Sequence, residues 1–220
     1  PIDLGANILA LNVGVAASGA VAVNAALTGN VVANSVTAEI DDSTVTSTAG
    51  DIVLDSDLSS GIIALTVGVA GSGSVAVNAT GFGNVIANST TASITGGSTV
   101  KATAGALDLD AETSGLIRSA AVSVAGSGAV AVGALIGANV VTNTTASDIV
   151  SSTVVTGTTL DVQARNSSEI LGLSVGVAGS GAAAVLLSLS ANVITDTTRA
   201  SIQGTDADRS SIDAGGAVTL

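Results

Sequence analysis

Apolar and polar residues alternate with a period of two along much of this chain. Residues 99–103 and 107–112 show the alternation most clearly. This period is typical of half-buried β-strands and not of helices. Between dense glycine and serine turn signals, we expect five short strands in one representative stretch: 62–70, 74–79, 84–94, 99–104 and 107–113. The turn signals are Gly71-Ser72-Gly73, Gly81-Phe82-Gly83, Gly96-Gly97-Ser98, Gly105 and Ser114-Gly115.

The pattern repeats four times along the chain. The segment that begins at Val13 returns at Val67, Val122 and Val175, at spacings of 54, 55 and 53 residues. A second marker keeps the same spacing: Asn30, Asn84, Asn139 and Asn192. A fixed period of this length indicates a repeat architecture. We therefore describe residues 1–220 as one continuous array with approximate units 8–61, 62–115, 116–169 and 170–220.

Repeated short strands with glycine at the corners predict coils stacked along one axis. We expect an all-β fold, a β-solenoid that forms a right-handed parallel β-helix from four repeats of about 54 residues. Two coils of about 27 residues or three of about 18 both fit one repeat. At roughly 4.8 Å between stacked strands, the four repeats would then form a rod roughly 40–60 Å long. We interpret the chain as a piece of a longer array.

The composition excludes several functions. The 220 residues contain no histidine, cysteine, methionine, tryptophan or tyrosine, which excludes thiol and histidine chemistry and Cys/His zinc sites. Phe82 is the sole aromatic residue, so nucleic-acid bases would have no stacking platform. A net charge of −12 also repels phosphates, and we expect no nucleic-acid partner. We expect no enzyme activity.

Charge is absent from four long blocks. Positions 4–38, 58–100, 119–147 and 170–195 contain no charged residue. These blocks are hydrophobic enough to suggest membrane helices, but they lack flanking Lys/Arg clusters and Trp/Tyr belts. We therefore expect no membrane spanning.

The uncharged blocks leave two interpretations open. Either small residues on the outer face are simply tolerated, or that face is buried against another copy in a lateral pair or filament. The candidate assembly face consists of Val75, Ala76, Val77, Ala129, Val130 and Ala131.

The order of motifs within each repeat resembles a known protein family. A Val-x-Val-Ala-Gly-Ser-Gly segment is followed by Asn-Val-Val/Ile, by a Thr-Ala-x-Ile strand and by Leu-x-Leu-x-Ala. This order is similar to the repeats of filamentous haemagglutinin-like and leukotoxin-like large bacterial exoproteins, which are adhesins. The resemblance covers nearly the whole chain. It implies a β-helical shaft, a location outside the cell or on the bacterial surface, and roles in cell adhesion or biofilm.

Acidic pairs at alternate strand positions are the candidate ligand site. Asp55 and Asp57 align with Asp110 and Glu112 of the next repeat, and Asp108 joins the same stripe. Alternate residues of a strand point to one face. Calcium, the one cofactor we consider, could bind to the carboxylates of Asp55, Asp57, Asp108 and Asp110. Alternatively, these carboxylates could act as acid and base on a polysaccharide. The third repeat carries Gln163 and Arg165 instead, which argues against a uniform row of metal sites, and a solvated outer stripe is the simpler interpretation of the acids.

The repeated asparagines have a structural interpretation. Asn30, Asn84, Asn139 and Asn192 stand beside glycine or small residues, and asparagine tolerates the left-handed backbone of corners. We predict that they form structural corners.

The sequence as a whole predicts a structural and adhesive role. We expect a stalk of an extracellular bacterial fibre or adhesin that self-associates into filaments, with cell-surface or matrix glycans as further partners. The alternative from another class is a β-helix that binds or cleaves polysaccharide with its carboxylate stripe.

Overall fold

The computed structural model describes residues 7–220, so the first six residues of the predicted array lie outside it. Every regular element of the described chain is a β-strand. The strands are β1 (Ile8–Ser18), β2 (Val21–Val32), β3 (Ser35–Asp41), β4 (Thr44–Ser47), β5 (Ile52–Ser72), β6 (Val75–Thr95), β7 (Thr99–Ala102), β8 (Leu107–Ser127), β9 (Val130–Val150), β10 (Thr153–Thr156), β11 (Leu160–Ser180), β12 (Ala183–Ile194), β13 (Thr197–Gln203), β14 (Ser211–Ala214) and β15 (Val218–Thr219). No helix long and apolar enough to cross a membrane occurs within residues 7–220.

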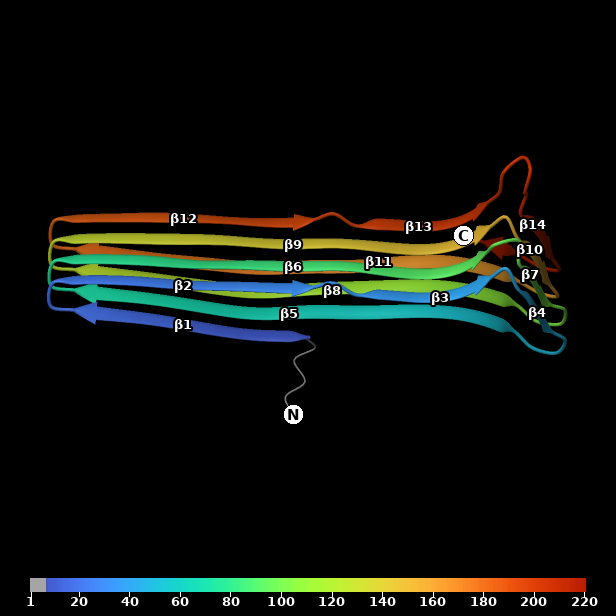
Figure 1. Cartoon of the computed structure of the whole chain (residues 1–220), viewed down its shortest axis with the longest axis horizontal. Helices are drawn as coiled ribbons and strands as arrows, with labels where there is room; N and C mark the ends of the chain where they lie inside the picture. The colour runs from blue at the N-terminus through green and yellow to red at the C-terminus, as the bar shows by residue number, and fades with distance from the viewer. Residues whose placement is uncertain (1–6) are drawn as a thin grey trace.

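Three parallel sheets wind into a β-solenoid, which confirms the predicted fold class (Figure 1). The first long sheet has the order β1-β5-β8-β11-β15. The second long sheet has the order β12-β9-β6-β2, with β3 and β13 beside β6 and β9. The short sheet has the order β14-β10-β7-β4. Figure 1 shows tight turns at one end of the long strands, here called the tip, and the short sheet at the other, here called the corner end.

Each repeat of about 54 residues forms one coil, not two or three. Ile8 pairs with Ile62, and Ile62 pairs with Ile117, so neighbouring coils are one sequence repeat apart. The central strands of the long sheets have 21 residues, or about 70 Å at 3.3 Å per residue. Four coils stack to only about 20 Å. The molecule is therefore a wide flat ribbon segment, and the predicted rod of 40–60 Å is wrong.

The strands are longer than predicted because several glycines that read as turns lie within strands. Gly81 and Gly83 belong to β6, and Gly115 belongs to β8. Gly137 of β9 shows the reason. A Cβ placed on Gly137 would overlap the ring of Phe82 in the neighbouring coil. Gly115 and Gly137 make room for larger side chains inside the sandwich, and all four glycines lie in extended strands and do not bend the chain.

The true turns lie at the two ends of the ribbon. At the corner end, Asp42, Gly97 and Ser151 adopt positive φ just before the short sheet begins. At the tip, a Cβ on Gly73 would overlap the carbonyl oxygen of Gly19, and the same relation joins Gly128 to Gly73. A column of glycines therefore lets successive tip turns stack closely.

The apolar core is concentrated where three sheets meet. Near the corner end, Leu107, Val100 and Ile149 are completely buried and belong to one cluster with residues of all three sheets. A second cluster around Ile62 and Ile86 lies toward the middle of the ribbon. Each fully buried side chain of this size contributes about 1.5–3 kcal/mol. The corner end is thus the conventional hydrophobic core of the fold.

Candidate functional site

The tip half of the first long sheet carries large apolar side chains on its outer surface. Burial alternates along β5, so that Ala64 and Thr66 point inward while Leu65 and Val67 point outward. In the first coil, Leu11 and Val15 are 68% and 69% exposed. We call this surface the leucine face. It consists of Leu9, Leu11, Val13, Val15, Ile63, Leu65, Val67, Val69, Ala120, Val122, Val124, Leu171, Leu173, Val175 and Val177.

Much of the interior of the same half is small and polar. Thr66, Asn78 and Ser123 are completely buried between the two long sheets. Asn78 donates to the carbonyl oxygen of Gly68 at 2.8 Å and to Ser123 Oγ at 2.9 Å. In the tip half, polar groups therefore share the interior with the buried cluster of Phe82, Ala121 and Leu135, while many large apolar groups lie outside. Such a distribution favours an apolar environment around the outer surface.

The leucine face was not predicted, although the sequence carries a signal for it. In the fourth coil, Leu171, Leu173 and Val175 alternate with Gly172 and Ser174. The usual reading of such alternation places the large residues inside. Here Gly172 points inward, where a Cβ would meet the side chains of Asn139 and Asn192, and the large residues point outward.

The repeated asparagines form a ladder through the interior and not the predicted corners. Asn30 Nδ2 donates to Asn84 Oδ1 at 2.7 Å, Asn84 Nδ2 to Asn139 Oδ1 at 2.8 Å, and Asn139 Nδ2 to Asn192 Oδ1 at 2.8 Å. All four side chains lie within long strands. The correction has a simple cause, because an amide carries both a donor and an acceptor and can therefore bond identical residues above and below.

A second row of asparagines bonds the backbone of the preceding coil. The main-chain N–H of Asn34 donates to Asn88 Oδ1 at 3.3 Å, and that of Asn88 to Asn143 Oδ1 at 3.2 Å. The N–H of Asn143 then donates to the carboxylate of Asp196 at 2.9 Å. Both rows fix the register between coils, because a slip of one residue would leave these buried groups without partners.

The predicted assembly face is divided between the inside and the outside of the coil. Ala76 and Ala131 are completely buried and point inward, which removes them from any outer surface. Val75, Val77 and Val130 point outward from the second long sheet and are half-buried. Ala129 lies in the tip turn between β8 and β9. The outer surface of this sheet is therefore apolar as well, but its residues are smaller.

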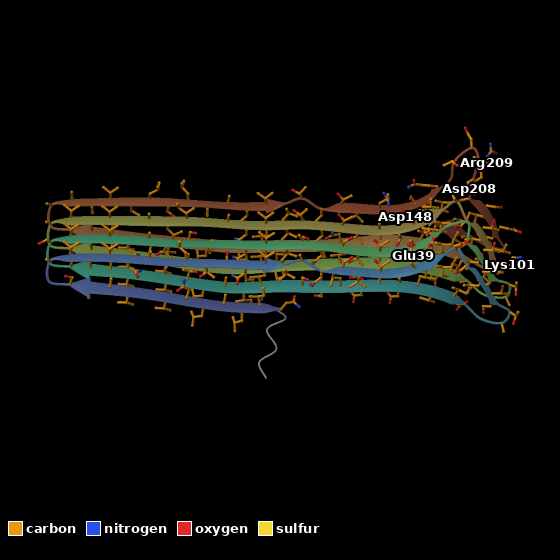
Figure 2. The ribbon with its side chains drawn as sticks, in the orientation of Figure 1. Glu39, Lys101, Asp148, Asp208 and Arg209 are labelled. Carbon is orange, nitrogen blue, oxygen red and sulfur yellow. The ribbon has the colours of Figure 1, made fainter. Side chains whose placement is uncertain are left out.

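Charged side chains gather at the corner end. Figure 2 shows Glu39, Lys101, Asp148, Asp208 and Arg209 at the end of the ribbon that carries the short sheet. Asp148 is buried in β9 and accepts hydrogen bonds from Arg199 and from Ser201 Oγ, the latter at 2.6 Å. Its carboxylate raises the pKa of Arg199, mainly through the hydrogen bond between them. This pair links neighbouring coils at the charged end.

The four candidate calcium ligands lie on one surface, as predicted. Asp55 pairs in register with Asp110, and Asp108 is two residues away on the same side of the first long sheet. Burial, followed by the charge of Asp161, raises the pKa of Asp108. Arg165 Nη1 contacts Asp110 Oδ2 at 2.6 Å. The last of the four, Asp57, pairs with Glu112.

The stripe does not form an evident metal centre. Within residues 7–220, no three or more acidic side chains come together in a group that could hold a metal ion. Carboxylates on one face of a flat sheet reach a cation from one side and leave most of its coordination sphere to water. Calcium binding therefore stays a prediction for this stripe.

Comparison with known protein-family models, curated proteins and solved structures finds no match for this chain.

Proposed function

We propose that the chain is a structural segment of an extracellular bacterial adhesin or fibre, in which stacked coils form the shaft. The observation that supports this proposal most strongly is the equivalence of successive coils. Identical contacts recur from one coil to the next, as in the amide ladder from Asn30 to Asn192. Repeat proteins of this kind grow by adding units that contact only their neighbours.

The resemblance of the repeats to haemagglutinin-like and leukotoxin-like exoproteins supports the extracellular setting. The distribution of chemistry along the chain also suits a passive shaft. Polar interior groups such as Asn84 and Asn139 bond to one another and do not face a cleft. Self-association, together with cell-surface or matrix glycans at the corner end, completes the proposal.

Deletion of one complete coil tests the structural part. Removal of residues 62–116 joins Gly61 to Ile117, which stands in register with the deleted Ile62. We expect the shortened chain to keep its β-sheet circular dichroism spectrum and a cooperative unfolding transition. The matched control removes residues 62–88, which is half a coil, and should unfold the chain because every register downstream is lost. Equal tolerance of both deletions would contradict the shaft proposal.

Surface labelling tests the extracellular part. An antibody raised against residues 7–220 should label intact cells of the source organism. Labelling that requires permeabilised cells would contradict an extracellular location and would leave the conclusions about the fold unchanged.

A further inference from the structure

The leucine face is large enough to form a weak interface. It extends over four strands at about 4.8 Å spacing and over seven residues at about 3.3 Å, a flat footprint of about 440 Å². Two such surfaces in contact would cover about 900 Å², the size of a weak or transient protein interface. The patch is also as large as the largest apolar patch of a typical monomer.

The leucine face has a specific shape in addition to its apolar character. At one level across the sheet, Leu65, Ala120 and Leu173 stand side by side in successive coils. The small Ala120 leaves a hollow between its two leucine neighbours, and this hollow is lined almost entirely by apolar atoms. A hollow between ridges accepts an apolar side chain of a facing sheet, as in the interdigitated packing of β-sandwiches.

Charge determines how two such faces can meet. The acidic stripe with Asp55 and Asp110 continues the same outer surface toward the corner end. If two copies packed with their strands in the same direction, each stripe would face its counterpart across about 10 Å and the like charges would repel. If the strands run in opposite directions, the two tip halves overlap and the acidic halves project from opposite ends.

We propose that the leucine face docks a second copy of this chain, tip half on tip half, with strands antiparallel about a two-fold axis along the stacking direction. The same patch then serves both copies, as symmetric dimers require. Arg118, the one charged residue within segments 8–32, 62–86, 117–141 and 170–194, stands at the edge of the overlap. This inference concerns the purified chain and does not depend on where the protein resides.

Sedimentation velocity of the chain across a concentration series tests the docking. Leu65→Asp should weaken dimerisation at least about tenfold, because a carboxylate would be desolvated in each half of the interface. The matched control, Val77→Asp, places the same charge on the outer surface of the second long sheet and should leave the dimer unchanged. Loss of the dimer in the control, or its persistence in Leu65→Asp, would overturn the proposal.

Ala120→Leu separates specific docking from general stickiness. The substitution adds apolar area but fills the hollow, so specific docking should weaken by about tenfold. Stronger association in this variant would show non-specific hydrophobic contact and overturn the proposal. Circular dichroism of each variant checks that the coil remains folded, and the outward position of both side chains makes folding the expected result.

The direction of the strands is measured with a spin label at the tip. The chain contains no cysteine, so Ala17→Cys in β1 provides a single attachment point. Antiparallel overlap places the two labels about 30 Å apart, whereas parallel packing places them within about 20 Å. The antiparallel dimer should also be insensitive to salt, because its acidic ends are separated by more than the Debye length of about 8 Å. A chain that stays monomeric in buffer and instead floats with neutral phosphatidylcholine vesicles would overturn self-docking in favour of lipid.

Discussion

Truncation of one asparagine inside the ladder should cost far more stability than truncation of an asparagine at its end. Asn84 is completely buried and makes two amide bonds, accepting from Asn30 and donating to Asn139. Asn84→Ala removes both bonds, worth about 1 kcal/mol each. It also leaves Asn139 Oδ1 buried without that donor, a penalty of about 1–3 kcal/mol. We therefore expect a loss of about 3–5 kcal/mol.

Asn192→Ala is the matched control at the open end of the stack. Asn192 is exposed and accepts one bond from Asn139 Nδ2, which also donates to Ser119 Oγ at 2.9 Å. The amide of Asn139 therefore keeps a partner when Asn192 is truncated. We expect a loss of about 1 kcal/mol or less.

Urea unfolding followed by far-UV circular dichroism measures both losses. The midpoint and slope together give the free energy of unfolding, and an unchanged slope shows that the comparison is valid. Equal losses of stability at the two positions would refute the ladder reasoning. Asparagines that act only as corners would contribute the same free energy in every coil, at the end of the stack as in its middle.

Three further substitutions test the packing and charges described above. Gly73→Ala should lower the free energy of unfolding by about 1–3 kcal/mol, because the new Cβ meets the preceding tip turn, whereas Gly71→Ala, which faces open space, should be nearly neutral. Gly137→Ala should destabilise the chain by a similar amount, and a double variant with Phe82→Leu should recover part of the loss if the ring causes the clash. The folded state raises the pKa of Asp108, so stability falls as the pH rises from the unfolded pKa through the folded one. Asp108→Asn should therefore raise the thermal midpoint near about pH 7 and leave it unchanged below about pH 3, and a gain that persists at low pH would contradict the shift.

The sequence predicts the class of fold well because strand period and repeat period are local signals. The alternation in residues 107–112 and the spacing from Val67 to Val122 are read directly along the chain. The number of residues in one coil is not set by a local signal. Gly81 and Gly115 belong to short sequences that are typical of turns. Only contacts with other strands show that both residues lie within strands.

The candidate site was predicted only in part, because some of its features are local in the sequence and others are not. Alternation correctly placed the carboxylates of Asp55 and Asp110 together on an outer surface. Near the tip, alternation could not show which of the two sets of alternate residues faces outward, because Val, Ala and Gly occur in both sets. Inward-pointing Ala76 therefore entered the predicted assembly face, and outward-pointing Leu65 did not.

A coil of one repeat gives a longer array unequal stiffness in two directions. The cross-section is about 70 Å wide and about 10 Å thick between sheet planes. For a uniform beam, the ratio of the two bending stiffnesses equals the square of the ratio of width to thickness, here roughly fifty. An array of such coils would therefore flex and twist across its thin dimension while resisting bending in its own plane, so it would lie along a curved surface like a tape.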